Sequence, residues 1–321
     1  MGRVGAKMTR KTFGICVALA GTILATCALV LATTLQPAEA AFPGAGGKIA
    51  FAKENTQDCT NTIPRECSYE IYTINPDGSG QKRLTNNGLA DTQPAWSPNG
   101  RKIAWLAYRG GGYGLFTMNA NGDNTTRIFN GKDSYPTWSP DGKKIAFSTN
   151  GDLFIVNADG SGQATQLTNK PGLDTFPDWS PDGDKIAFMR GDSSTGEIYT
   201  IDATSPESAT NQPIQLTDNA GKANTAPSWS PNAAKIAFDS NRDGDFDVYR
   251  MNADGTNEVR LTNSTALDGN PAYSPSGTKI AFESKRNGRS EIYKMDANGT
   301  DETRLTRNKV QDVVPDWQPL P

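Results

Sequence analysis

Six acidic or amide side chains recur along the chain, each three residues before a proline. They are Asp91, Asp133, Asp174, Asn224, Asp268 and Asp312. Oxygen ligands of this kind suit a hard cation such as calcium, and carboxylates also pair with a basic peptide segment or an amine. The same side chains could instead cap the turn that leads into a strand, or bond the backbone of a neighbouring repeat. Both roles stay open, although a residue found in every repeat usually serves the repeat itself.

The residue types needed for most enzyme mechanisms are missing. The chain contains no histidine, which excludes Ser-His-Asp and Cys-His nucleophile systems and histidine-ligated metal sites. No serine lies in a Gly-x-Ser-x-Gly context, and residues 139–142 do not match a sialidase-type Asp box. Glycoside chemistry by paired carboxylates needs only Asp and Glu. We therefore predict a protein that is not an enzyme, with a carbohydrate-active hydrolase or lyase as the alternative.

Two further patterns combine acids with glycine or arginine. Residues 243–247, Asp-Gly-Asp-Phe-Asp, resemble a calcium loop, but the sixth position holds Val248 instead of the required glycine, so a turn is predicted. Arg242 and Arg286 each stand five residues before an acid that opens a strand, Asp247 or Glu291. This spacing predicts a surface ion pair that shapes the loop, and no metal site is assigned.

A repeat that fills most of the chain must position these side chains. A tryptophan in the pattern Pro-x-Trp recurs at Trp96, Trp138, Trp179, Trp229 and Trp317, with Tyr273 in the remaining copy, at steps of 41 to 50 residues. A Lys-Ile-Ala segment begins at Lys48, Lys102, Lys144, Lys185, Lys235 and Lys279. Repetition at this period, built from short β patterns, is typical of propeller blades.

Each repeat predicts four strands. Pro-x-Trp forms the first, and its proline fits only an edge strand, here the innermost one, which would line a central channel. A Ser-Pro-Asp-Gly turn leads to the second strand, Lys-Ile-Ala-Phe, whose two apolar faces fit between neighbouring blades. The third is rich in β-branched and aromatic residues, and the fourth is short and polar, as suits an outer edge. Residues 203–213 lengthen one connection between third and fourth strands.

The first and last repeats are incomplete in complementary ways. No Pro-x-Trp segment precedes Lys48, and no Lys-Ile-Ala segment follows Trp317. Joining the C-terminal strand to the first blade completes six four-stranded blades and removes the open ends. The predicted fold class is therefore all-β, a six-bladed β-propeller closed by the C-terminal strand. In such a ring the six residues from Asp91 to Asp312 would encircle one mouth of the channel, and the alternative enzyme would use carboxylates in that channel.

The first forty residues predict export. Four basic residues precede an apolar run at about residues 13–35, and Ala38-Glu39-Ala40, a small-x-small motif, follows it, as in a secretory signal peptide. The run is long enough to span a bilayer, so an uncleaved membrane anchor is the alternative. We assign residues 1–40 to the signal peptide, 41–47 to a short linker and 48–321 to the propeller. A secreted or periplasmic, cell-envelope location is expected.

Cysteine content and charge narrow the range of partners. Cys59 and Cys67 lie in one insertion, and an oxidising compartment favours a disulfide between them. Two thiols without a histidine make only half a zinc site. Loss of residues 1–40 removes four basic residues and one acid, which changes the net charge from −3 to −6. An acidic chain without a basic run is a poor partner for nucleic acid.

The repeat resembles that of the TolB-like six-bladed β-propellers, a WD40-like Pro-Asp repeat family. The resemblance rests on Pro-x-Trp-Ser-Pro-Asp-Gly-x-x-Ile-Ala-Phe, an Ile-Tyr strand and Arg-Leu-Thr, and it covers residues 48–317 six times. It implies a periplasmic or secreted protein-binding module, although similar blades also gate substrates in prolyl-oligopeptidase-like hydrolases. TolB itself has an α/β domain before its propeller, whereas only residues 41–47 separate the expected cleavage site from the blades here.

These observations together predict a non-catalytic binding module. Its channel mouth would present the ring of acids to a protein or peptide partner. No cofactor is expected, and calcium is the metal that the oxygen ligands would favour if one binds. Membrane contact would follow only from a retained anchor, and the module is expected to be a monomer.

Overall fold

The computed structural model describes residues 47–56, 68–132, 135–219 and 221–320. All of them belong to one compact unit, Ala38–Pro321. The predicted signal peptide, most of the linker, Cys59, Cys67 and Asp133 lie outside the described residues. Within the described ranges, no helix is long and apolar enough to cross a membrane.

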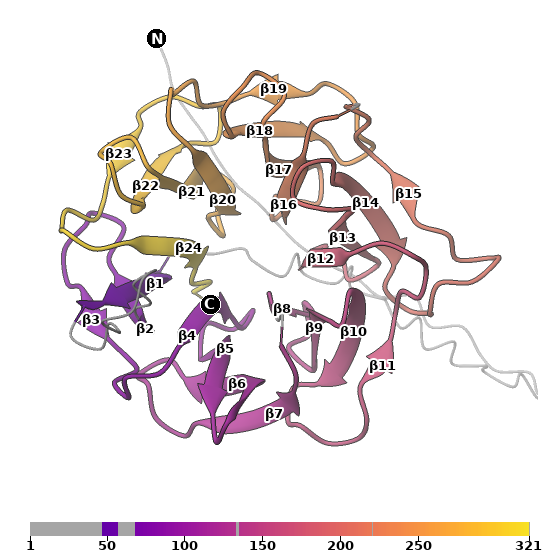
Figure 1. Ribbon diagram of the computed structural model, residues 1–321, viewed down its shortest axis with the longest axis horizontal. Helices are drawn as coiled ribbons and strands as arrows, with labels where there is room; N and C mark the ends of the chain where they lie inside the picture. The colour runs from indigo at the N-terminus through magenta and orange to yellow at the C-terminus, as the bar shows by residue number, and fades with distance from the viewer. Residues whose placement is uncertain (1–46, 57–67, 133–134, 220, 321) are drawn as a thin grey trace, which may run out of the picture. The chain divides into compact units, whose positions relative to one another are not determined.

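Six sheets of four antiparallel strands stand around a central axis, which confirms the predicted all-β six-bladed propeller (Figure 1). The innermost strands are β24 (Asp312–Trp317), β4 (Asp91–Trp96), β8 (Thr137–Trp138), β12 (Asp174–Trp179), β16 (Asn224–Trp229) and β20 (Asp268–Tyr273). The second strands are β1 (Ile49–Asn55), β5 (Lys102–Arg109), β9 (Lys144–Thr149), β13 (Lys185–Arg190), β17 (Lys235–Ser240) and β21 (Lys279–Ser284). Blades are numbered one to six in this order.

The outer half of each blade consists of a third strand and a short fourth strand. The third strands are β2 (Ser68–Ile74), β6 (Gly112–Asn119), β10 (Asp152–Asn157), β14 (Glu197–Asp202), β18 (Asp247–Asn252) and β22 (Glu291–Asp296). The fourth are β3 (Lys82–Arg83), β7 (Thr126–Asn130), β11 (Thr165–Gln166), β15 (Ile214–Gln215), β19 (Val259–Arg260) and β23 (Thr303–Arg304). Most fourth strands have two residues, which leaves little open edge for pairing with another chain.

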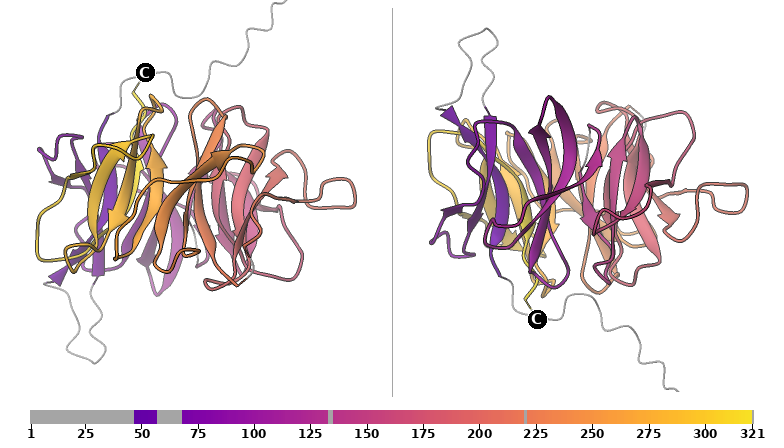
Figure 2. Two further views of the ribbon diagram at one scale, coloured as in Figure 1. Left: turned by 90° about the horizontal axis from the view of Figure 1, so that it is seen from above. Right: turned by 90° about the horizontal axis from the view of Figure 1, so that it is seen from below.

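The C-terminal strand closes the ring, as predicted. β24 pairs antiparallel with β1, with Trp317 opposite Ile49 and Asp312 opposite Lys53. Beyond the strand, the Gln318 backbone N–H donates to the carbonyl of Lys48 at 2.8 Å. Figure 1 shows yellow β24 beside indigo β1, and Figure 2 shows the blades edge-on. The first blade thus takes its inner strand from the end of the chain.

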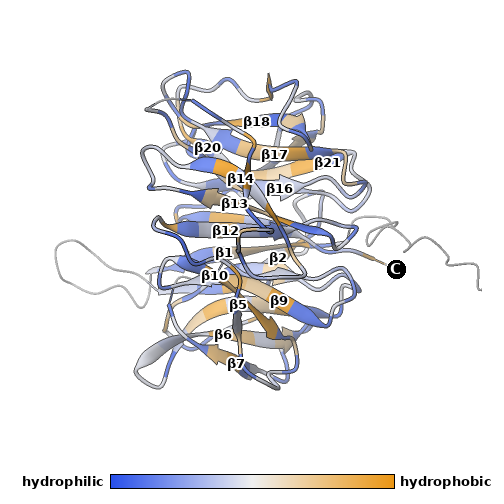
Figure 3. Cartoon of the chain, turned by 90° about the vertical axis from the view of Figure 1, so that its right-hand side faces the viewer, coloured by the Kyte–Doolittle hydropathy of each residue, from blue (hydrophilic) through white to orange (hydrophobic). Residues whose placement is uncertain are grey.

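The core lies between blades. The second strand of each blade alternates alanine on one face with isoleucine and an aromatic ring on the other. Ala52 packs with Trp105 of blade two, whereas Phe51 faces Ala281 of blade six, and all four side chains are fully buried. Figure 3 shows the apolar residues concentrated in the strands and the polar ones in the loops. Each buried isoleucine or phenylalanine contributes roughly 1.5–3 kcal/mol to the free energy of unfolding, so packing between neighbouring blades stabilises the ring.

Five of the described inner strands, β4, β12, β16, β20 and β24, are bent by one extra residue just before their proline. In β4, Thr92 pairs with Leu106 and Ala95 with Ala104, so three steps on β4 match two on β5, which is a β-bulge. The residue before the proline has positive φ in all six blades, including Tyr135, which precedes the two-residue strand β8. We call these six the bulge residues: Gln93 (56°), Tyr135 (37°), Phe176 (53°), Ala226 (48°), Asn270 (50°) and Val314 (51°). The proline after each bulge lies at the sheet edge, as predicted, where its missing N–H costs no ladder hydrogen bond.

Candidate functional site

An axial cavity of about 190 Å³ lies between the inner strands of all six blades. Its wall is formed by the bulge residues, the prolines that follow them, and the Pro-x-Trp residues: Pro94, Ala95, Trp96, Pro136, Thr137, Trp138, Pro177, Asp178, Trp179, Pro227, Ser228, Trp229, Pro271, Ala272, Tyr273, Pro315, Asp316 and Trp317. The five described members of the predicted ring, Asp91, Asp174, Asn224, Asp268 and Asp312, are not among these lining residues. The repeat therefore places two different sets of side chains near the axis.

The predicted ring residues open the inner strands. The described members are Asp91, Asp174, Asn224, Asp268 and Asp312, and all five are fully buried. The sixth, Asp133, lies outside the described residues. Each described member is held by its own blade or a neighbouring segment, so the structure does not bring their carboxylates together around an open site.

Arginines from the end of the second strand, or just beyond it, neutralise several of these acids. Arg109 Nη2 donates to both carboxylate oxygens of Asp91, at 2.6 and 2.8 Å. Nε and Nη2 of Arg190 both donate to the carboxylate of Asp174, each at 2.7 Å. Such two-pronged pairs are among the strongest polar contacts in proteins. A ligand would reach these carboxylates only by displacing the arginine, and this geometry fits the structural role that the sequence left open.

The remaining ring members are also occupied. Arg286 donates to Asp268 at 2.6 Å, and Asn224 accepts from Arg242 at 2.7 Å. Asp312 accepts from the side chain of Asn308, and burial raises its pKa against the opposing effect of nearby Lys53. The binding role of the ring therefore stays a prediction. In the structure its described members form hydrogen bonds and ion pairs with other segments of the chain.

The predicted pairing of Arg242 with Asp247 and of Arg286 with Glu291 is wrong. Both arginines turn back toward the residue that opens the first strand, because each guanidinium lies over an aromatic pair of its blade. The Arg242 guanidinium carbon is 4.5 Å from the ring centre of Tyr249. Asp247 and Glu291 pair instead with arginines of the fourth strand, Arg260 and Arg304.

Residues 243–246 form a turn and irregular connection before β18, in line with the predicted turn. Gly244 donates its N–H to the carbonyl of Asn241 at 3.0 Å, and Asp243 accepts from the hydroxyl of Tyr249. Over the described part of the chain, no group of three or more acidic, cysteine or histidine side chains is arranged to hold a metal ion.

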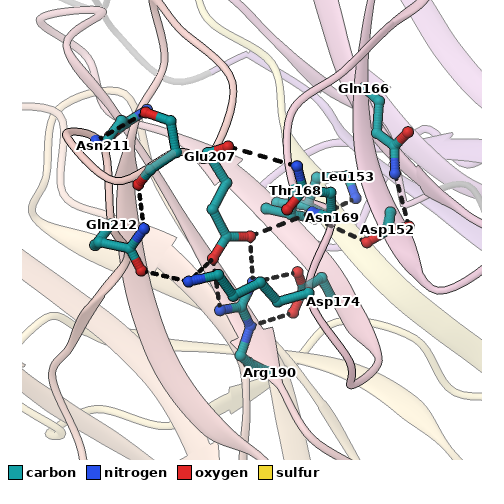
Figure 4. Close-up of polar contacts among 12 residues, drawn as sticks. Asp152, Leu153, Gln166, Thr168, Asn169, Asp174, Arg190, Glu207, Asn211 and Gln212 are labelled. Carbon is teal, nitrogen blue, oxygen red and sulfur yellow. Dashed lines mark hydrogen bonds and ion pairs between the residues drawn. The ribbon is translucent and has the colours of Figure 1, made fainter.

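Blade four carries a polar network around Arg190 (Figure 4). Glu207, from the lengthened connection between β14 and β15, accepts from Nη1 and Nη2 of Arg190, at 3.2 and 3.1 Å, and the same Nη2 also donates to Asp174. The Glu207 backbone N–H donates to the carbonyl of Leu167 at 2.7 Å, and Asn169 donates its N–H to the Glu207 carboxylate. Glu207 therefore joins this connection of blade four to the segment that follows β11 of blade three, and Arg190 holds the same carboxylate from within blade four.

Two carboxylates that line the axial cavity were not predicted as site residues from the sequence. Asp178 and Asp316 occupy the middle of Pro-x-Trp and keep part of their surface open. Asp178 accepts the backbone N–H of Trp229, and Asp316 that of Trp96, each 2.6 Å away on the next blade. They were visible in the sequence as the only acids at this position of the repeat, but their significance depends on the ring geometry.

The environment of these carboxylates disfavours their charge. They lie deep among the blades, and burial raises the pKa of both Asp178 and Asp316 to about 7. The charge of Asp178 adds to the rise at Asp316. Neither carboxylate forms an ion pair with a described lysine or arginine, in contrast to Asp91 and Asp174.

A third buried carboxyl, Asp239 of β17, supports a prediction about pH. It is 8% exposed, accepts from the Thr225 hydroxyl at 2.9 Å, and has one oxygen without a hydrogen-bond partner. Burial raises its pKa to about 7, above the value of about 3.9 expected in the unfolded chain. The folded state therefore holds an extra proton between pH 4 and 7, and the stability that this gives is lost as the pH rises through 7.

We expect Asp239→Asn to raise the free energy of unfolding by roughly 2 kcal/mol at pH 8 and to change it little at pH 5. The amide can keep the hydrogen bond with Thr225 without a buried charge. Urea unfolding at the two pH values measures the difference, and Asp184→Asn, at an exposed carboxyl, serves as the control. An equal gain at both pH values would contradict the prediction.

The ring of six four-stranded sheets around a lined cavity defines the chain as a six-bladed β-propeller. Residues 27–150, 128–211 and 207–320 match the TolB beta propeller domain family. Because these matches cover most of the chain, the protein belongs to that family.

Known proteins agree with this assignment. TolB from Acinetobacter baumannii has the same fold, with a TM-score of 0.73 and 22% identity over 85% of this chain and 67% of that one. The Tol-Pal system protein TolB of Desulfosudis oleivorans is 41% identical over 49 residues, 15% of this chain and 11% of its own length. Dipeptidyl-peptidase 5 of Porphyromonas gingivalis is 40% identical over 42 residues, 13% of this chain and 6% of its own. The chain thus matches only a small part of these two relatives.

Proposed function

We propose that the protein is a non-catalytic binding module, exported to the cell envelope, that presents one end of its channel to a protein or peptide partner. Membership of the TolB propeller family supports a binding role. The name of one relative places that relative in a Tol-Pal system. Export rests on the signal peptide predicted at residues 1–40.

The observation that carries this proposal is the set of bulge residues. All six hold the same left-handed backbone conformation and line the axial cavity. Their side chains nevertheless differ from blade to blade, whereas the prolines beside them do not vary. Residues that only maintain the blade have no reason to differ in this way, because the backbone demand is identical in each copy. The variation therefore gives each blade a different side chain at the channel wall, so the wall has an asymmetric chemistry that a partner can recognise.

The positive-φ conformation of the bulge residues is energetically unfavourable. A residue with positive φ is ordinarily glycine or asparagine, and a β-branched residue such as Val314 is a true outlier there. Strain of about 1–3 kcal/mol per residue is commonly retained at ligand sites. Two of the bulge residues also form an aromatic contact, with the ring centres of Tyr135 and Phe176 4.0 Å apart. An aromatic surface inside a rigid ring is well suited to hold a peptide side chain.

Photocrosslinking can test the proposal. We expect benzoylphenylalanine in place of Phe176, which keeps an aromatic ring at the channel wall, to yield a discrete adduct with a protein or peptide of the native host. The same group at Thr165, exposed on the outer strand β11, is the control. Mass spectrometry identifies the adduct. No adduct at position 176, or the same adducts at both positions, would refute binding at the channel.

Calcium binding, the role of the acid ring and the monomeric state stay as predictions within this proposal. Metal analysis of the purified protein and its mass by light scattering measure the first and the last. The acid ring is tested by Asp268→Asn, which keeps the shape of a buried side chain and would reduce crosslinking at position 176 only if the ring contributes to binding.

The two cavity carboxylates are the one feature that favours the enzyme alternative. Glycoside hydrolysis uses two carboxyls, one protonated as the general acid and one ionised as the base or nucleophile. Asp178 and Asp316 each accept a backbone N–H from the next blade, however, so both already have a structural use. We expect no release of reducing ends from a polysaccharide panel, and release that disappears in Asp178→Asn would establish the enzyme.

A further inference from the structure

The buried acids of the described residues differ in how their charge is balanced. Asp91, Asp174 and Asp268 each lie within 2.7 Å of an arginine nitrogen. Asp178 and Asp316, in the axial cavity, have no such partner within the described chain. An unbalanced carboxylate in a poorly solvated place is costly unless a proton or an external cation completes it. Asp239 also has no basic partner, but it is not among the residues that line the axial cavity. Asp178 and Asp316 are therefore the described acids without a basic partner that a ligand in this cavity can approach.

The two carboxylates belong to opposite sides of the ring. Asp178 lies on β12 in blade four and Asp316 on β24 in blade one, three blades apart in a ring of six. Both residues line the same cavity, and the charge of Asp178 is felt at Asp316. A group bound on the axis would therefore lie between two negative charges.

The rest of the wall is rich in aromatic rings and proline. The indole nitrogens of Trp96, Trp229 and Trp317 are buried and have no acceptor, although these residues line the cavity and are only 5–7% exposed. Because these nitrogens have almost no accessible surface, the three residues contribute apolar ring surface to the cavity wall and no hydrogen-bonding group. Tyr135 and Phe176 add two rings in tilted contact. The cavity thus combines two carboxylates that have no basic partner with an apolar, aromatic wall, and a basic side chain with its aliphatic stem complements both.

We propose that the channel takes a lysine or arginine side chain of its peptide partner between Asp178 and Asp316. This assignment rests on the binding function proposed above and specifies the chemistry of the partner. The guanidinium or ammonium group pairs with the two carboxylates, and its aliphatic stem lies against the prolines and rings of the wall. A cavity of about 190 Å³ has room for such a group, since one water needs only about 10–15 Å³ by the same kind of measure.

A metal ion fits the same place less well. Calcium takes six to eight oxygen ligands, whereas the cavity contributes two carboxylates, and the described residues contain no group of three acidic, cysteine or histidine side chains arranged to hold a metal ion. Aromatic and proline surfaces stabilise an organic cation but offer nothing to a hydrated metal ion. A basic side chain and a metal ion would both bring a cation to the carboxylates, and the titration below distinguishes them.

Titration followed by the indole signals in ¹H–¹⁵N spectra tests the site directly. The probe is acetyl-Gly-Arg-Gly-amide, its neutral analogue replaces arginine by citrulline, and calcium chloride alone is a third arm. We expect the arginine peptide, and not the other two, to shift indole signals. Asp178→Asn or Asp316→Asn should weaken binding about tenfold and the double variant should abolish it, because each removes one charge-assisted contact. Asp184→Asn, exposed on the same blade, should bind as the parent does.

Several results would overturn the assignment. They are an absence of shifts at millimolar arginine peptide, equal binding of the citrulline peptide, binding that survives in the double variant, or a calcium response that equals or exceeds the peptide response. Thermal unfolding of each variant confirms that it is folded. The crosslinking experiment at Phe176 reports a partner whatever chemistry holds it. Crosslinking without an arginine response therefore refutes only the basic side chain, whereas an arginine response without crosslinking refutes the partner.

Discussion

Deletion of residues 312–321 is expected to abolish cooperative folding. The deletion removes the inner strand of blade one, so β1 loses its pairing with β24 and becomes a bare edge. It also removes Trp317, which is 5% exposed and packs with Ile49 and Phe51. Loss of one buried tryptophan alone costs about 3–5 kcal/mol. Because a domain is stable by only about 5–15 kcal/mol, the whole strand exceeds what the fold can lose.

Circular dichroism and urea unfolding measure this effect. A shorter deletion, of Leu320 and Pro321, is the matched control, because Leu320 is 38% exposed and lies beyond the closing strand. Trp317→Tyr is a milder variant that copies the natural residue of blade six, Tyr273, and should keep a cooperative transition. A deletion of residues 312–321 with parental stability would show that closure by the C-terminal strand does not hold the ring together.

The fold was predictable because closure is a matter of counting. The Lys-Ile-Ala copies begin one segment before the Pro-x-Trp copies, so only a join between Trp317 and Lys48 leaves every blade with four strands. The positions of strands followed from period-two patterns and turn residues, which depend on local geometry. Proline restricted the first strand to an edge, and the structure has it there.

The site was less predictable because its contacts cross the repeat. The acids at Asp91 and its equivalents were found by their spacing, but their arginine partners stand 16 to 18 residues later, after a hairpin whose path decides which acid they meet. The bulge cannot be recognised from Gln93 or Val314, since neither residue favours positive φ. Asp178 and Asp316 become a pair only when the ring brings blades one and four across the axis.

Arg190→Met is expected to lower the free energy of unfolding by about 3–5 kcal/mol, the usual loss when one partner of a buried ion pair is removed. Arg190 joins Asp174 and Glu207, whose side chains are both 0% exposed, so its loss leaves two carboxylates buried at the junction of blades three and four. Hydrogen bonds from Arg190 and Asn169 hold the pKa of Glu207 below its usual value in spite of burial. Without Arg190, burial favours the protonated form of Glu207, and part of the lost stability should return as the pH falls from 7 to 5.

A comparison of Glu207 with Glu302 tests whether burial makes the ion pair of Arg190 stronger than a more exposed ion pair. Glu207→Gln should cost about 2 kcal/mol or more, because Arg190 loses a buried charge partner, with the amide keeping some hydrogen bonds. In blade six Arg286 pairs in the same manner with Glu302, but that carboxylate is 27% exposed, so Glu302→Gln should cost less than about 1 kcal/mol. Urea unfolding of both variants and of the double variant Arg190→Met, Glu207→Gln gives the coupling. Equal costs for Glu207→Gln and Glu302→Gln would mean that burial at the blade junction adds nothing to the ion pair.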